Sequence, residues 1–413
     1  MKIKQYSMLS LASLVAAHAN AAGFQVAEHS ASGLGRAFSG EAVVADNASV
    51  LARNPSAMTL FERAQFSGAI SVVDPEVNIW DKTNGESSKD VAPMQIVPAA
   101  YYVSPINDKW SWGIGMFTTY GVATDYPNDI QAGDMAGDTA LISVNLNPAV
   151  AYRINEHFSI GGGLNLVYAH AELTRHKGAL APAFSADPSD NLIGLEGDTF
   201  GFGWNVGATY EINQDHRFGF GYRSQVDLDF DDGEFTSYDS GIATSPTVTG
   251  RLEIALPAIW EISGFHQLTE EFSLHYSYQR TDWSTFTELK ATSPDCNDGT
   301  ANQCFYKEEH YEDNGRWSIG GTYQFSPSWI GRIGFAFDEQ AGEATLSIPD
   351  SDRTWYSAGV TYIYSDDLSF DAGFAYVASK DGSFTETNAL DETLEFDSEG
   401  SAYISSIQMN YSF

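Results

Sequence analysis

The sequence predicts an all-β membrane protein: a 14-stranded antiparallel barrel with an N-terminal plug of short helices inside its lumen. Three observations lead to this fold class. Apolar and polar residues alternate over most of the chain, short turns alternate with long polar loops, and an N-terminal leader precedes a segment of small residues. Aromatic residues make up 13% of the chain, and disordered acidic proteins lack aromatics, so disorder is excluded.

The first 21 residues have the pattern of a secretory signal peptide. Lys2 and Lys4 form a positive start, an apolar run follows over 8–17, and Ala19-Asn20-Ala21 has the small residues of a cleavage site. A buried N-terminal helix is the alternative. Beyond residue 21 no apolar run reaches 18 residues, so no membrane helix is expected. We therefore expect residues 1–21 to be removed during export.

Residues 22–63 form the predicted plug. This stretch does not alternate and is rich in Gly, Ala and Ser, which favours short helices and turns over strands. Because it has no apolar span of its own, we expect it to lie inside the barrel. A periplasmic tail is the alternative.

Residues 64–413 form the predicted barrel. At the C-terminus, Ile407, Met409 and Tyr411 share one face while Gln408 and Asn410 share the other. An even strand number, with short turns on one rim and long loops on the other, is typical of bacterial outer-membrane barrels. A soluble β-sandwich or secreted β-helix is the alternative. The predicted strands are 64–74, 94–104, 109–121, 139–153, 157–175, 196–212, 216–231, 248–264, 271–290, 308–325, 328–339, 352–364, 367–379 and 398–413.

The charge balance and the aromatic residues indicate the partners. With 55 acidic against 21 basic residues, the net charge of −34 excludes nucleic-acid binding, which needs clustered Lys and Arg. We expect a monomer in the bacterial outer membrane, with aromatic girdles against lipid and acidic loops bridged to lipopolysaccharide by divalent cations. The terminal Phe413 is expected to contact the barrel-assembly machinery.

The lumen is predicted to be partly apolar, which favours a hydrophobic ligand over ions or sugars. Arg175 has the same strand parity as Asn165, so it faces the lumen, where a guanidinium can hold a carboxylate through two hydrogen bonds. The alternative is that such arginines pair with lumen acids and brace the barrel.

Other motifs carry little chemistry. Cys296 and Cys304 lie in a polar loop of an exported chain, which predicts a disulfide. We expect no metal site and no cofactor, because neither cysteine has histidines at ligand spacing. The histidines are scattered without a catalytic constellation, so we expect no enzyme.

The segment GFQVAEHSASGLGRAFSGEAVVADNASVLARNPSAM (23–58) resembles the hatch of the FadL family of outer-membrane long-chain fatty acid transporters. The resemblance continues through PINDKWSWGIG, TTYGVATDY, FGFGWNVG, YRSQVDLDF, SIPDSDRTWYSAG and FDSEGSAY. It implies a 14-stranded barrel closed by a hatch, capture of ligand at the extracellular loops, and sideways release beside a kinked third strand.

The resemblance also implies site residues. The hatch motif falls on Asn54-Pro55-Ser56, with Ser in place of the family's Ala, and the N-terminal contact falls on Phe24. The strand kink falls at Gly121, which fits the tendency of strand-interior glycines to mark bends. The inner-site arginine falls on Arg175.

The sequence departs from the family pattern at two places. A second inner-site base, a lysine in the family, is replaced by Glu312, and Arg316 lies further along the same face, so we assign the ligand head group to Arg175 and Arg316. The third long loop, 176–195, is short, although it keeps apolar residues that could form an outer groove: Leu180, Phe184, Leu192 and Ile193.

The function predicted from the sequence is passive uptake of long-chain fatty acids or similar hydrophobic molecules across the outer membrane by lateral diffusion through the barrel wall. Burial of the acyl chain would drive binding, at about 0.8 kcal/mol per CH₂. Uptake of aromatic hydrocarbons by the same fold is one alternative. A structural or adhesive barrel with a sealed lumen is another.

Overall fold

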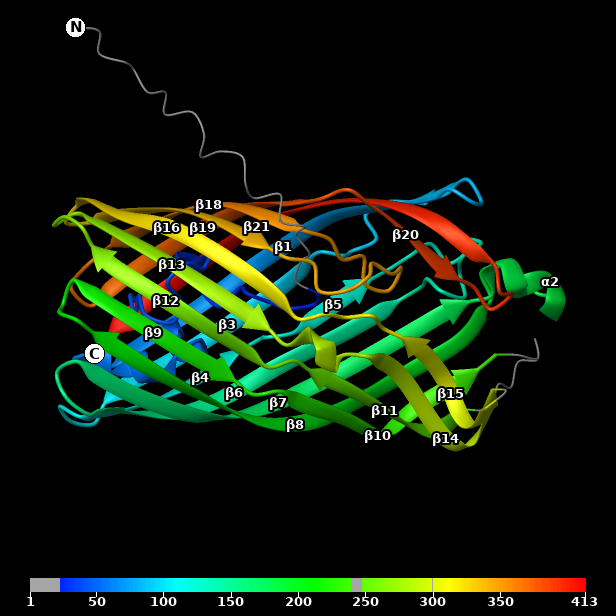
Figure 1. Cartoon of the computed structure of the whole chain (residues 1–413), viewed down its shortest axis with the longest axis horizontal. Helices are drawn as coiled ribbons and strands as arrows, with labels where there is room; N and C mark the ends of the chain where they lie inside the picture. Colours follow the sequence, from blue (N-terminus) through cyan, green and yellow to red (C-terminus); the bar gives the residue numbers. More distant parts are fainter. Residues whose placement is uncertain (1–22, 239–246, 299) are drawn as a thin grey trace, which may run out of the picture.

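The computed structural model describes residues 23–238, 247–298 and 300–413, and these form a long closed β-barrel (Figure 1). The predicted signal peptide, 1–21, lies outside the described residues. The barrel closes where β1 pairs antiparallel with β21, from Gln65 opposite Ser412 to Asp81 opposite Phe396. Among the described residues, no helix has the length and apolar character that crossing a membrane requires.

The wall consists of 14 antiparallel crossings, which confirms the predicted strand number. Nine crossings are single strands: β1 (Gln65–Asp81), β3 (Gln95–Pro105), β6 (Thr139–Arg153), β7 (Phe158–His176), β8 (Asn191–Glu211), β17 (Trp329–Asp338), β18 (Arg353–Ile363), β19 (Leu368–Ser379) and β21 (Thr393–Ser412).

The other five crossings are interrupted, which the alternation pattern did not predict. They are β4 (Trp110–Phe117) with β5 (Gly121–Thr124), β9 (His216–Arg223) with β10 (Val226–Ser237), β11 (Thr247–Leu256) with β12 (Ile259–Gln267), β13 (Phe272–Thr281) with β14 (Glu288–Asp298), and β15 (Thr300–Glu308) with β16 (Asn314–Ser326). Pro257, which has no N–H to donate, explains one interruption. The short 3-10 helix η4 (Trp283–Thr285) fills another.

The two rims differ as the sequence predicts. Short turns and the C-terminus lie at one end, while β14, β15, β20 (Gly382–Thr387) and α2 (Ala181–Phe184) extend from the other (Figure 1). Short β2 (Glu86–Ser88) and the 3-10 helix η3 (Gly178–Leu180) belong to the long-loop end. In outer-membrane barrels the short turns are periplasmic and the long loops extracellular.

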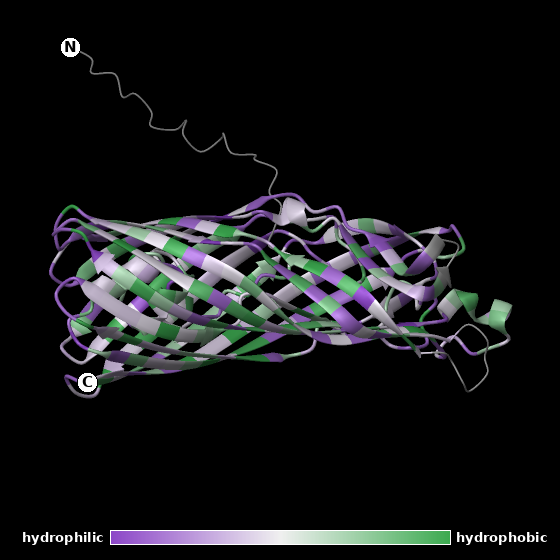
Figure 2. Cartoon of the chain, turned by 90° about the horizontal axis from the view of Figure 1, so that it is seen from below, coloured by the Kyte–Doolittle hydropathy of each residue, from purple (hydrophilic) through white to green (hydrophobic). Residues whose placement is uncertain are grey.

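Side chains alternate across the wall, so that hydrophilic and hydrophobic residues succeed each other along the strands (Figure 2). On β8, the outward Phe200 and Phe202 are 61% and 75% exposed, whereas the inward Asn205 and Thr209 are buried. Outward aromatic residues therefore face lipid, and the small or polar inward residues leave room in the lumen.

Residues 23–62 fill the lumen near the short-turn rim (blue in Figure 1). They contain α1 (Ala31–Leu34) and the 3-10 helices η1 (Ala48–Ala52) and η2 (Pro55–Leu60), which contact strands on opposite sides of the wall. The backbone approaches the wall so closely that a Cβ added at Gly359 of β18 would lie 2.7 Å from the Cα of Gly35. We call residues 23–62 the inner segment.

A buried ion-pair network holds the inner segment. The guanidinium of Arg36 contacts Glu41 at 2.6 Å and Asp46 at 2.8 Å, and Arg332 of β17 contacts the same Asp46 at 3.1 Å. Burial alone would raise the pKa of Asp46, but the two arginines outweigh it and lower that pKa to about 2. The carboxylate of Asp46 therefore stays ionised at any physiological pH.

Candidate ligand-binding site

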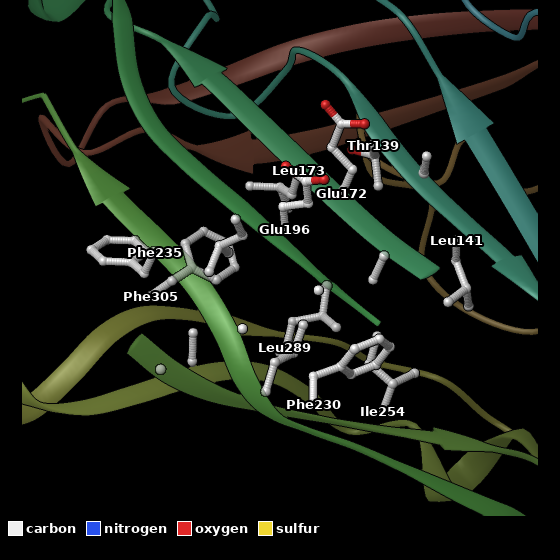
Figure 3. Close-up of a pocket in the computed structure, with 18 of the residues that line it drawn as sticks. Thr139, Leu141, Glu172, Leu173, Glu196, Phe230, Phe235, Ile254, Leu289 and Phe305 are labelled. Carbon is white, nitrogen blue, oxygen red and sulfur yellow. The ribbon is translucent and has the colours of Figure 1, made fainter. Parts of the chain in front are cut away.

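An apolar cavity, here called the inner cavity, is lined by side chains from several strands of the wall (Figure 3). The space free of protein atoms, including its open mouth, is about 790 Å³. Small residues on neighbouring strands, including Ala171, Gly197 and Gly250, leave this space open. Larger apolar side chains line it: Leu141, Leu173, Phe230, Phe235, Ile254, Leu289 and Phe305.

Arg175 lies behind one polar corner of the inner cavity, beside Thr139. Its guanidinium donates to the Oγ1 of Thr139 at 3.2 Å, to the Oγ of Ser347 at 2.8 Å, and to the backbone carbonyls of Asp138 and Thr174 at 3.0 and 2.8 Å. The side chain is buried, with 1% exposed. Its hydrogen-bond partners in the part of the chain that the structure describes are all neutral oxygens. A buried cation with only neutral acceptors can accept an anion.

Lys307 on β15 is a second cation at this corner, and the sequence analysis did not single it out. Its Nζ lies 3.2 Å from the Oγ of Ser347, so Lys307 and Arg175 share one hydroxyl. Lys307 has the same parity as Phe305, which lines the inner cavity. The alternation predicts strands over 271–290 and 308–325 and leaves Lys307 in the loop between them, where no parity argument applies, whereas the structure places it in β15.

Arg316, the other arginine assigned to the head group, has different partners. It forms an ion pair with Asp338 at 2.5 Å, donates to the carbonyl of Ala37 at 3.2 Å and stacks on Trp355 with 4.6 Å to the ring centroid. The indole of Trp355 also donates to Asp338 at 2.7 Å. Arg316 thus ties the inner segment to the wall, which is the alternative role considered for lumen arginines. Its hydrogen-bond and ion-pair partners differ from those of Arg175.

A second space, here called the lateral cavity, is lined both by lumen-facing residues such as Phe24 and by residues of the outer wall surface. About 1,710 Å³ of it is free of protein atoms, and its lining includes Ile96 and Ile142, which are 64% and 53% exposed on the outer surface. It lies where wall pairing is incomplete. Residues 95–99 of β3 pair with β1, but β3 pairs with β4 only from Ala100 onward, and β5 pairs with β6.

Phe24 separates the two cavities. Its ring packs edge-on against Trp283, Phe286 and Tyr120, with centroid distances of 4.7, 5.3 and 5.9 Å, and it lines both spaces. Ile348 also lines both. The partition between the cavities is therefore a thin apolar layer that includes the first described turn of the inner segment.

The backbone near Phe24 substitutes for missing wall pairing. The amide of Gly121 donates to the carbonyl of Phe24 at 3.0 Å, and the amide of Val26 donates to the carbonyl of Thr119 at 2.8 Å. These bonds fall between β4 and β5, so the chain bends immediately before Gly121. Space is tight there, because a Cβ on Gly121 would lie 3.3 Å from the carbonyl oxygen of Leu141.

Asn54, Pro55 and Ser56 bind the inner segment to β8. The Oδ1 of Asn54 caps η2 by accepting from the Ser56 amide at 3.0 Å, and Pro55 occupies the first turn. The Nδ2 of Asn54 donates to the carbonyl of Ala42 at 2.7 Å, and to the Ala208 carbonyl and the Thr209 hydroxyl of β8 at 3.2 Å. The hydroxyl of Ser56 lies 2.7 Å from that of Thr209.

The four residues assigned to an outer groove lie at the long-loop end, each in different surroundings. Leu180 is buried, and Phe184, at the end of α2, has Lys177 at 5.5 Å from its ring centroid. Ile193 packs against the cluster around Phe235, while its neighbour Leu192 is half-exposed.

The hairpin of β14 and β15 also belongs to the long-loop end. Cys296 and Cys304 are joined by a disulfide within it. Cys304 is buried in the same cluster as Phe235.

Comparison with known proteins decides the family. Residues 12–413 match the family model described as "Outer membrane protein transport protein (OMPP1/FadL/TodX)". The chain belongs to this family. Members of the OMPP1/FadL/TodX family are outer membrane transport proteins for hydrophobic substrates, not enzymes, and this chain is accordingly an outer membrane transporter of that kind.

Relatives of known name are similar over almost the whole chain. The "Long-chain fatty acid transport protein" of Escherichia coli O6:H1 is 37% identical, covering 97% of this chain and 96% of the relative. "Outer membrane protein P1" of Haemophilus influenzae is 37% identical, with both chains fully covered.

Solved structures of the OMPP1/FadL/TodX family share the fold. A FadL homologue of Pseudomonas aeruginosa superposes with a TM-score of 0.83 at 20% identity, covering 95% of this chain and 100% of the other. The toluene transporter TodX of Pseudomonas putida gives 0.70 at 16% identity, covering 96% and 100%.

Proposed function

We propose that this transporter takes up long-chain fatty acids, binding them in the inner cavity and releasing them sideways into the bilayer through the lateral cavity. The observation that carries the proposal is that the two cavities lie next to each other. The inner cavity is apolar with two cations at one corner, Phe24 forms a thin partition, and the lateral cavity on the other side reaches lipid. Relatives named as long-chain fatty acid transport proteins support the choice of ligand.

Burial of the acyl chain drives binding. Each CH₂ that leaves water for the inner cavity contributes about 0.8 kcal/mol, so ten buried methylenes offer about 8 kcal/mol before the entropy of ordering the chain is subtracted. The acidic character of the chain, with net charge −34, gives no attraction for a carboxylate from a distance. The acyl chain therefore leads capture, and the head group is recognised only inside.

Arg175 and Lys307 recognise the head group in this proposal. The hydroxyls of Ser347 and Thr139 now occupy donors of Arg175, and a carboxylate can replace these neutral acceptors with a charge-assisted pair. Hydrogen bonds to charged groups are worth about 1.5–3 kcal/mol, enough to favour a fatty acid over an alkane of equal length.

Exit requires the partition to move. Phe24 belongs to the inner segment, whose first described residues are hydrogen-bonded to the bend before Gly121. A shift of residues 23–26 would therefore move Phe24 and join the two cavities. From the lateral cavity, the acyl chain would pass between β3 and β5 and enter lipid without crossing a charged surface. The periplasmic side of the lumen stays filled by the inner segment.

Uptake of labelled oleate by a strain lacking its own transporter tests the proposal. Wild type is expected to restore uptake, Arg175→Gln to lower it about tenfold or more, and the matched control Arg63→Gln, which changes a half-exposed arginine at the short-turn rim, to leave it unchanged. Failure of wild type to restore oleate uptake would overturn the proposal, and failure with labelled toluene as well would favour a structural barrel with a sealed lumen.

Aromatic hydrocarbons are the second candidate ligands. Phe230, Phe235, Phe286 and Phe305 line the inner cavity, and rings pack well against rings. Uptake of labelled toluene by wild type, with no dependence on Arg175 and no uptake of oleate, would favour this alternative.

A further inference from the structure

Glu386 on β20 binds Lys307 at the polar corner of the inner cavity. One of its carboxylate oxygens lies 2.9 Å from the Nζ of Lys307, and the other accepts the amide of Leu346 at 3.0 Å. Both side chains are largely buried, with 13% and 16% exposed. A strand from the long-loop end thus brings a carboxylate to a cation of the proposed head-group site.

The contacts around Lys307 form a continuous chain. Glu386 binds Lys307, Lys307 donates to Ser347, and Arg175 donates to the same Ser347 hydroxyl and to Thr139, which lines the inner cavity. A fatty carboxylate that reaches this corner would meet a cation already neutralised by a carboxylate of the protein.

We propose that Glu386 is an internal competitor for the ligand head group: its carboxylate occupies Lys307 while the site is empty, and a fatty carboxylate displaces it. This inference rests on the proposed function, because it concerns the same site. It makes Glu386 a specificity-determining residue, since only a ligand with its own anion can take over Lys307, and an uncharged ligand leaves the contact intact.

The charge of the cluster explains why one carboxylate must leave. Glu309 is a second acid near Lys307, at 3.8 Å, and is 3% exposed. The cluster contains two basic side chains, Arg175 and Lys307, and two acidic ones, Glu309 and Glu386. A ligand carboxylate on Lys307 would place a second carboxylate beside that of Glu386 on one ammonium group, and like charges this close in a buried site repel each other. Glu386 lies on β20, which pairs with the beginning of β21 at the long-loop end.

Displacement of Glu386 would also reach the partition. Glu386 holds the amide of Leu346, the next residue is Ser347, and Ile348 lines both cavities beside Phe24. Release of this amide frees the short segment 346–348 from one of its anchors. Head-group binding is thereby linked, over three consecutive residues, to the layer that separates the cavities.

Equilibrium binding of oleate and of oleyl alcohol to the full-length protein in lipid nanodiscs tests the inference. Glu386→Gln is expected to bind oleate about tenfold more tightly, because removal of a charge-assisted contact frees Lys307, and to bind oleyl alcohol within about twofold of wild type. The matched control is Glu395→Gln, which removes an exposed carboxylate from β21 opposite Thr385 of the same hairpin. It should change neither affinity.

Amide hydrogen exchange at Leu346 gives an independent readout. Oleate should increase exchange there in wild type, oleyl alcohol should not, and Glu386→Ala, which removes the acceptor of the Leu346 amide, should exchange fast without ligand. The inference is overturned, while the proposed function stands, if wild type binds oleate but Glu386→Gln binds it no more tightly. It is also overturned if Glu386→Gln changes the affinities for oleate and oleyl alcohol by the same factor. If wild type binds no oleate, both are overturned.

Discussion

Asn54 offers the sharpest test of how the inner segment is held. Its side chain is fully buried and caps η2, and its amide donates to Ala42 within the segment and to Ala208 and Thr209 on β8. Truncation to alanine removes the cap, worth about 1 kcal/mol, and leaves two or more buried acceptors without a donor, at about 1 kcal/mol each. We therefore expect Asn54→Ala to weaken docking of the inner segment by about 3 kcal/mol.

Hydrogen exchange in nanodiscs measures this docking. A loss of about 3 kcal/mol corresponds to roughly a hundredfold faster exchange at residues 42–60, provided that they open together. Asn47→Ala is a matched control: Asn47 is also a buried cap, but its hydrogen bonds go to Ser32, Ser49 and Asp46 within the segment. It should loosen η1 alone. Equal effects of the two substitutions, or no effect of Asn54→Ala, would refute the assignment of Asn54 as the bond between segment and wall.

Three further outcomes follow from the structure. Because the pKa of Asp46 is about 2, below its ordinary value near 3.8, its ion pairs should contribute fully to folding stability above pH 4, and this stability should be lost as pH falls through 2. Thermal unfolding followed by circular dichroism should show the loss in wild type and not in Asp46→Asn. Replacing Cys296 and Cys304 by serine should cost the hairpin that carries them about 2–3 kcal/mol, seen as faster proteolysis of that hairpin alone. Gly359→Ala should displace the inner segment at Gly35, raising its hydrogen exchange, and an unchanged pattern would contradict the close backbone contact.

The wall was predictable because one physical rule governs it. In every crossing the side-chain period is two, so residues such as Phe202 and Asn205 reveal their faces without knowledge of the fold. The rim assignment follows equally from turn length. The kink at Gly121 is implied by the family resemblance, but the other interruptions have no such signal. The hydrogen bonds that join the bend to the distant Phe24 and Val26 are contained in no local pattern.

The site was predictable only in part. Strand parity places Arg175 in the lumen. Its hydrogen-bond partner Ser347, however, lies in a loop whose position the sequence does not specify. Lys307 was missed because its strand belongs to a hairpin that looks polar and irregular. Arg316 has the right parity, yet Asp338 neutralises it, and only three-dimensional proximity reveals that pairing.

The contact between the inner segment and its surroundings has a consequence for biogenesis. Residues near the beginning of the chain touch β8, β17, β18 and β19, and the wall is sealed by pairing of β1 with β21 along 17 positions. The segment packs against strands on opposite sides of the wall, so its contacts are complete only once the ring has closed. Docking of the segment and closure of the barrel are therefore coupled, and an incomplete wall around a misplaced segment would present open strand edges, which lipid does not tolerate.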